Sequence, residues 1–142
     1  MIQIRNALNQ ICYQMKDDNF KPDLIMGINR GGCIPGIYLS HKLNVPHEPL
    51  DIRLRDHKSE PDSVNLMNAV AENKKVLIID DINDTGSTFN YIYELFGNIK
   101  TVKYASLIHN APSEFDKLNY WCYTINKDIH PCWIVYPWEE WQ

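Results

Sequence analysis

The chain alternates between short continuous runs of apolar residues and stretches in which apolar residues recur every three or four positions. Continuous runs are typical of strands buried on both faces of a parallel sheet, and the spaced pattern is typical of amphipathic helices. The predicted strands are 24–28, 48–54, 76–79 and 101–108, and the predicted helices are 4–15, 34–41 and 89–96. This order predicts an α/β domain with a central, mostly parallel sheet flanked by helices.

Two stretches depart from this alternation. Residues 55–73 are mostly polar, and such a long connection in a small domain predicts a flap, with a short hairpin or helical turn near 64–70. The end of the chain, about 110–142, is rich in aromatic residues and contains two prolines after residue 130, which predicts a small hood. No linker composition separates these parts, so residues 1–142 are predicted to form a single domain.

Candidate chemistry is concentrated where the run 76–79 ends. Two adjacent carboxylates, Asp80 and Asp81, follow it directly, and their mutual repulsion would be relieved by a divalent cation or by sugar hydroxyls. Next come Asp84, Thr85, Gly86, Ser87 and Thr88. A turn of this kind before a helix can offer N–H groups, hydroxyls and the helix dipole to a phosphate.

A second polar loop follows the strand 24–28 and contains Arg30, Gly31 and Gly32. Because parallel sheets bind ligands beyond the carboxyl ends of their strands, we expect both loops to border one site.

Composition narrows the possible functions. The net charge of −4 argues against a general nucleic-acid-binding surface, although a local loop can still bind a small anion. No apolar run has the length of a membrane span, and the N-terminus lacks the pattern of a signal peptide. The four cysteines show no C-x-x-C spacing, so reduced, structural thiols in a cytoplasmic protein are expected.

Three segments together resemble a known family. Residues 76–88, with two acids followed by D-T-G-S-T, resemble the phosphoribosyl pyrophosphate signature of type I phosphoribosyltransferases. Residues 27–35 resemble the pyrophosphate loop of that family. The segment W-I-V-Y-P-W-E at 133–139 resembles the tail of its bacterial xanthine and hypoxanthine-guanine branch. The resemblance implies the type I phosphoribosyltransferase fold, with a C-terminal hood and a flexible flap.

The resemblance also implies an activity. It is the Mg²⁺-dependent transfer of a 5-phosphoribosyl group from phosphoribosyl pyrophosphate to xanthine, guanine or hypoxanthine, giving a nucleoside monophosphate and pyrophosphate in purine salvage. Asp80 and Asp81 would hold the ribose hydroxyls, directly or through Mg²⁺. The segment from Thr85 to Thr88 would hold the 5′-phosphate, and Asp84 would accept a proton from the purine. A cytoplasmic homodimer without nucleic-acid or membrane partners is the implied form.

Further roles follow residue by residue from the resemblance. The pyrophosphate would be held by Arg30, Gly31 and Gly32, with a cis peptide bond between Asn29 and Arg30. Trp133 would stack on the base, its alternative being a place in the core. Ile134 would offer backbone groups to the base edge. In the flap, Arg55 and Lys58 would either close over the donor or be solvated charges.

One position departs from the family. Related enzymes have a lysine after the strand that matches 102–108, where it contacts the exocyclic oxygen at purine position 6, and the simplest placement puts Asn110 there. An amide can donate a hydrogen bond but has no charge, so the identity of the base stays open. Two alternatives also stay open: a non-catalytic sensor of the donor or a nucleotide, and transfer to a different acceptor.

Overall fold

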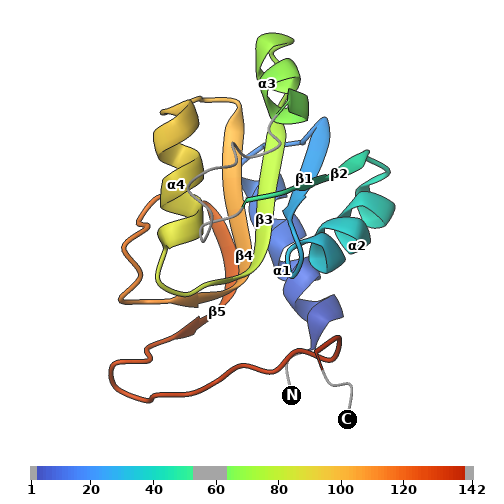
Figure 1. Cartoon of the computed structure of the whole chain (residues 1–142). Coiled ribbons are helices and arrows are strands. Elements are labelled where there is room, and N and C mark those ends of the chain that lie inside the picture. The colour runs from blue at the N-terminus through green and yellow to red at the C-terminus, as the bar shows by residue number, and fades with distance from the viewer. Residues whose placement is uncertain (1–2, 53–63, 140–142) are drawn as a thin grey trace.

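A five-stranded parallel sheet forms the centre of the protein (Figure 1). The structure is a computed structural model that describes residues 3–52 and 64–139. The strands are β1 (Leu24–Ile28), β2 (His47–Leu50), β3 (Val76–Asn83), β4 (Val102–Asn110) and β5 (Tyr120–Ile125), and they lie in the order β2-β1-β3-β4-β5. The helices are α1 (Ile4–Asp17), α2 (Cys33–Leu43), α3 (Val64–Ala71) and α4 (Ser87–Phe96). The predicted α/β class with a parallel sheet is confirmed.

Side chains that alternate along β3 divide the core into two halves. Leu77 and Ile79 pack in the half that contains the buried faces of α1 and α2. Val76 and Ile78 pack in the half that contains the buried residues of α3 and α4. All four side chains are fully buried, and burial of each aliphatic side chain of this size contributes about 1.5–3 kcal/mol. The continuous apolar run in the sequence is explained by this double burial.

Two strands are longer than the sequence predicts. The run 76–79 was expected to end the strand, but β3 continues through the carboxylates to Asn83, and β4 reaches Asn110 instead of residue 108. The extra residues of β3 pair with β4, as Ile82 does with Ile108 and Asn83 with His109. The polar side chains among the extra residues concealed this extension in the sequence, although hydrogen bonding between strand backbones does not require apolar side chains.

The predicted hood and flap need correction. The hood was placed at about 110–142, but Tyr120–Ile125 is β5, the parallel edge strand of the main sheet. Of the predicted flap, 55–73, the part Val64–Ala71 is helix α3, which buries Leu66 and Ala69. The predicted strand 48–54 is β2, which ends at Leu50. Its last two residues and the first part of the flap lie outside the described residues.

Residues 111–119 connect the parallel strands β4 and β5 and contain no helix. Phe115 anchors it, because this buried ring stacks on Phe89 of α4 at 5.2 Å and meets Tyr104 of β4 edge-on. An aromatic cluster therefore covers the sheet where a crossover helix would usually lie.

The strand order places a topological switch point between β1 and β3. The chain runs from β1 outward to β2 and then returns to the other side of β1 to form β3. Ligands of open α/β sheets bind at such a switch point, beyond the carboxyl ends of the strands. Within residues 3–52 and 64–139, no helix has both the length and the apolar character needed to cross a bilayer.

Candidate active site

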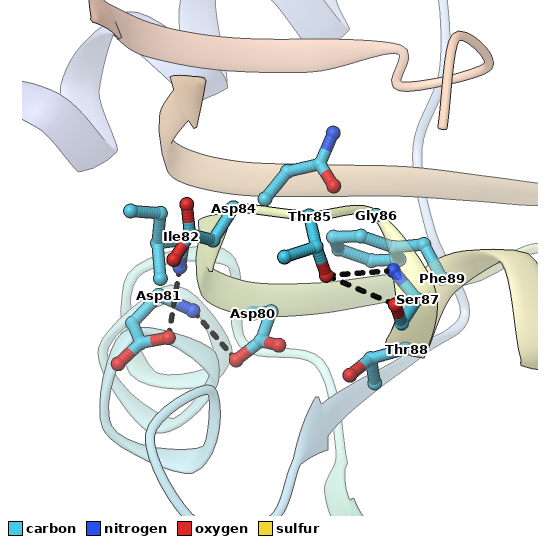
Figure 2. A pocket seen from close by; sticks show the side chains of 10 residues that line it. Asp80, Asp81, Ile82, Asp84, Thr85, Gly86, Ser87, Thr88 and Phe89 are labelled. Carbon is cyan, nitrogen blue, oxygen red and sulfur yellow. Dashed lines mark hydrogen bonds between the residues drawn. The ribbon is translucent and has the colours of Figure 1, made fainter. Parts of the chain in front are cut away.

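Asp80 and Asp81 lie within β3, two to three residues before its end at Asn83, and not in a loop as the sequence suggested. The N–H of Asp81 donates to Oδ1 of Asp80, and the N–H of Ile82 donates to Oδ1 of Asp81, each at 2.8 Å (Figure 2). These bonds hold both carboxylates in place near the carboxyl end of β3.

Both carboxylates are in an unfavourable environment for a negative charge. Burial raises the pKa of Asp80 well above its usual value, and the neighbouring charge of Asp81 raises it further. Burial also raises the pKa of Asp81. A cation or hydroxyl donors would relieve this cost.

The donor set fits Mg²⁺ as a partial shell. Magnesium prefers oxygen ligands and is commonly held by one or two carboxylates, with water and ligand oxygens completing the octahedron. In the part of the chain that the structure describes, no three acidic, histidine or cysteine side chains gather into a metal site. Asp80 and Asp81 could therefore contribute two ligands, and a phosphorylated sugar and water would supply the others.

The turn after β3 forms a small cavity of about 200 Å³ lined by residues 80–89. Gly86 has φ +89°, and a Cβ atom there would lie 2.5 Å from the backbone nitrogen of Phe115. Only glycine fits this conformation and this close approach. Helix α4 begins at the next residue, and no side chain caps it at Gly86.

Hydroxyl groups line this turn as well. Oγ1 of Thr85 lies 3.0 Å from Oγ of Ser87 and accepts a hydrogen bond from the N–H of Ser87 (Figure 2). The cavity thus combines hydroxyls with a helix N-terminus, a combination that suits a phosphate group.

The loop after β1 packs directly against the end of β3. The peptide bond between Asn29 and Arg30 is cis, as predicted. A Cβ atom on Gly31 would lie 2.3 Å from Oδ2 of Asp81, and one on Gly32 would lie 2.3 Å from the carbonyl oxygen of Ile79. Glycine at both positions is what allows the backbone of this loop to reach the carboxylates.

A larger cavity of about 640 Å³ adjoins this loop. Its lining comes from the loop, α2 and the C-terminal segment: Arg30, Gly31, Ile34, Trp133, Val135, Trp138 and Glu139. Trp133 is 83% exposed, which excludes the core position that the sequence left open for it. Ile134 packs its side chain against the core, so its backbone is what it can offer to a ligand.

The C-terminal segment is tied to the carboxylate end of β3. The hydroxyl of the buried Tyr136 donates to the carbonyl oxygen of Asp81 at 2.8 Å, and its ring stacks on Trp138 at 4.6 Å. The N–H of Tyr136 donates to Glu139. These contacts bring the segment to the same edge of the sheet as the two loops.

Asp84 is engaged by two residues, one of which the sequence did not single out. The ammonium of Lys127, in the turn after β5, lies 2.9 Å from Oδ2 of Asp84. Asn110 donates to the carbonyl oxygen of Asp84 at 3.1 Å and to its Oδ1 at 3.3 Å. Both polar atoms of the Asn110 side chain thus have partners inside the protein, and the base contact expected for this residue stays a prediction.

Lys127 was not predicted as a site residue, because the strand β5 that precedes it was not predicted from the sequence. Lys127 lies two residues beyond the end of a parallel strand, at the edge of the sheet where such folds bind ligands, but the partly exposed segment 120–125 was interpreted as part of a hood. The flap residues Arg55 and Lys58 lie outside the described residues.

Comparisons with known proteins agree with this geometry. The chain belongs to the phosphoribosyl transferase domain family, whose sequence profile matches residues 2–141. The xanthine-guanine phosphoribosyltransferase of Vibrio atlanticus is 27% identical over 116 residues, which cover 81% of this chain and 71% of that protein.

Solved structures are similar over nearly the whole chain. A purine phosphoribosyltransferase from Pyrococcus horikoshii is 26% identical, with a TM-score of 0.71 and coverage of 98% of this chain and 90% of that one. The xanthine-guanine-hypoxanthine phosphoribosyltransferase of Helicobacter pylori shares the fold at 16% identity, with a TM-score of 0.71 and coverage of 95% and 87%.

Proposed function

We propose that this protein transfers a 5-phosphoribosyl group from phosphoribosyl pyrophosphate to a ring nitrogen of a purine base. The observation that carries the proposal is a pair of cavities beside the switch point of the sheet, where Gly31 of one cavity packs closely against Asp81 of the other. One is lined by the carboxylates and the phosphate-type turn after β3, and the other by Arg30, Gly31 and the exposed Trp133. The names of the relatives point to xanthine, guanine and hypoxanthine as acceptors.

The sugar and its phosphate belong at the end of β3. Asp80 and Asp81 would bind the ribose hydroxyls, directly or together with Mg²⁺, and their charge would stabilise the positive charge that develops on the sugar carbon. Mg²⁺, when bound, would neutralise charge on the leaving pyrophosphate. The N–H groups and hydroxyls of Thr85, Ser87 and Thr88, with the backbone of Gly86, would hold the 5′-phosphate.

The leaving group belongs beside the loop after β1. The backbone of Gly31 and Gly32 approaches Asp81 closely, so a pyrophosphate held there would lie next to the ribose. The exposed guanidinium of Arg30 would supply a charge-assisted contact to its oxygens.

The base belongs in the larger cavity. Trp133 offers an exposed ring face on which a purine would stack, and the backbone of Ile134 would meet the base edge. Asp84 lies between the phosphate turn and Lys127, where its carboxylate would accept the proton that the ring nitrogen loses as the new C–N bond forms.

A panel of bases tests the proposal. The protein is incubated with phosphoribosyl pyrophosphate and Mg²⁺, and pyrophosphate release is measured with xanthine, guanine, hypoxanthine, adenine and uracil. We expect release with at least one oxopurine, and loss of release when Mg²⁺ is chelated. Donor binding without release for any base would instead identify a non-catalytic sensor, and release only with uracil would identify a different acceptor class.

A further inference from the structure

Asn83 is a buried polar residue to which the proposed reaction gives no role. It is the last residue of β3, contributes to the lining of the small cavity after that strand, and is only 1% exposed. Its amide nitrogen lies 3.1 Å from Nδ1 of His109 and 3.3 Å from the carbonyl oxygen of Phe115. Its amide oxygen lies 3.0 Å from Oγ of Ser113. A buried amide is costly unless its polar atoms have partners, so these contacts restrict how the surrounding segments can be arranged.

The directions of these hydrogen bonds follow from the chemistry of the partners. The carbonyl oxygen of Phe115 can only accept, so the nitrogen end of the Asn83 side chain faces it, and the second hydrogen on that nitrogen donates to Nδ1 of His109. Nδ1 is therefore unprotonated, and the ring is neutral with its proton on Nε2. Burial lowers the pKa of His109, which favours this neutral form, and the ring packs 5.2 Å from the ring of Trp121. His109 thus supplies a fixed acceptor from β4.

Ser113 extends these hydrogen bonds to the crossover segment, residues 111–119. The hydroxyl of Ser113 donates to the amide oxygen of Asn83 and accepts a hydrogen bond from the N–H of Phe115 at 3.2 Å. The N–H of Glu114 donates to the carbonyl oxygen of Thr85 at 2.9 Å. The crossover segment is therefore bonded both to the end of β3 and to the turn that follows it.

The turn after β3 is packed tightly against the same residues. A Cβ atom on Gly86 would lie 2.6 Å from Oγ of Ser113 and 2.5 Å from the backbone nitrogen of Phe115. The backbone of the turn is thus in contact with the two crossover residues that Asn83 binds. Because the N–H groups proposed to hold the 5′-phosphate belong to this backbone, a shift of the crossover segment would change the direction in which they point.

We propose that Asn83 is a positioning residue for the 5′-phosphate site: His109 fixes its amide, and the amide fixes the crossover segment that keeps the turn at 85–86 in the shape a phosphate needs. The inference rests on the proposed function. Asn83 exchanges no proton in the reaction. Its contribution is limited to the sugar-phosphate side of the site, because the hydrogen bonds described above do not involve the loop after β1.

The test compares two ligands that together make up the donor. Ribose 5-phosphate would occupy the turn after β3, and inorganic pyrophosphate would occupy the loop after β1. Dissociation constants are measured by phosphorus NMR titration, with Mg²⁺ in every sample, and they require neither a base nor turnover. A change that acts on the turn alone affects the first ligand and not the second.

The variants remove one partner at a time. They are Asn83→Leu, Ser113→Ala, His109→Leu and His109→Gln, of which only the last keeps an acceptor oxygen for the Asn83 amide. Asn119→Ala is the matched control, because the side chain of Asn119 also bonds the crossover segment to β4. It accepts from the N–H of Tyr104 at 2.8 Å, near the start of that strand and away from the turn. Thermal unfolding shows which variants fold, and if Asn83→Leu does not, the His109 and Ser113 variants decide the question.

We expect Asn83→Leu, His109→Leu and Ser113→Ala to weaken binding of ribose 5-phosphate by about 5- to 50-fold, the value of one or two hydrogen bonds, and to change pyrophosphate binding by less than about twofold. His109→Gln should restore most of the lost affinity, and Asn119→Ala should leave both ligands unaffected. Equal weakening of both ligands would show a merely structural role and overturn the proposal, as would unchanged binding of ribose 5-phosphate.

Failure of the proposed function would give a different result. If the wild-type protein bound both ligands but turned over no base, the proposed catalysis would be contradicted, while the selective effect on ribose 5-phosphate would still support the role of Asn83. If the wild-type protein bound neither ligand, the proposed function and this inference would both be contradicted.

Discussion

The two halves of the site are built in different ways. The proposed donor side, which we define as residues 80–88 with the loop 29–32, is encoded by two short segments whose backbones meet at the switch point. The proposed acceptor side, which we define as Trp133 with its neighbour Lys127 and with Asn110, combines single residues from separate parts of the chain. The proposed donor side can therefore be predicted from a continuous motif, whereas the proposed acceptor side depends on how β4, β5 and the C-terminal segment pack together.

The largest expected effect is at the residue where the two sides meet. Asp84→Asn removes the proton acceptor but keeps the shape of the side chain, so kcat should fall by about 10²- to 10⁴-fold. The KM for phosphoribosyl pyrophosphate should change little, because other groups hold the donor. Steady-state kinetics with the preferred base measure both values, and an unchanged kcat would remove Asp84 from the chemistry.

The donor side should be most sensitive to the backbone of its turn. Gly86→Ala forces a side chain into a left-handed conformation and against Phe115, and these two costs together are about 2–4 kcal/mol of folding stability. Gly97→Ala is the matched control, since its φ is also positive, at +73°, but no atom lies within 4 Å of the added Cβ. Thermal unfolding should show the larger loss of folding stability for Gly86→Ala. Equal losses for the two variants would mean that the contact with the crossover segment contributes nothing to the cost.

On the acceptor side, truncation of Trp133 should separate base binding from donor binding. Stacking of one base on an aromatic ring is worth about 1–3 kcal/mol, so Trp133→Ala should raise the KM for the base by about 5- to 150-fold. The ring is 83% exposed, so the melting temperature should hardly change. A parallel rise in the KM for phosphoribosyl pyrophosphate would contradict the separation of the two sides.

The smallest effect concerns stability and pH on the donor side. The folded-state pKa of Asp80 is raised, so folding favours the protonated carboxyl; this contribution is present below the ordinary pKa of Asp and is lost as pH rises through the raised value. Without ligands, Asp80→Asn should therefore stabilise the protein at neutral pH, and the gain should shrink as pH falls toward about 4. Denaturant unfolding across this range measures it, with the exposed Asp116→Asn as control. If the difference in unfolding free energy between Asp80→Asn and the wild-type protein were the same at all pH values, the raised pKa of Asp80 would be contradicted.

The same contrast explains what the sequence could predict. The apolar runs at 24–28 and 76–79 gave two central strands, because each is buried on both faces. The motif at 80–88 gave the donor side, because its parts are adjacent in the chain. The cis bond before Arg30 followed from the resemblance of its loop to a family loop.

Other features were hidden for physical reasons. Only Tyr120 of the edge strand β5 is buried, and no helix precedes this strand, so its segment was interpreted as part of a hood. The contact of Lys127 with Asp84 depends on the register of β4 and β5, in which Asn110 pairs with Ile125. Register between distant strands is not encoded in any local sequence pattern, so the sequence analysis could not place Lys127 beside Asp84.

The most direct test of the account is the stoichiometry of the reaction. The protein is mixed with phosphoribosyl pyrophosphate, Mg²⁺ and the preferred oxopurine, and nucleoside monophosphate and pyrophosphate are quantified in the same samples. The account predicts that both products appear in equal amounts, and that Asp84→Asn slows both equally. Pyrophosphate released with ribose 5-phosphate instead of a nucleotide would show hydrolysis without an acceptor, and would contradict a site that holds donor and base together.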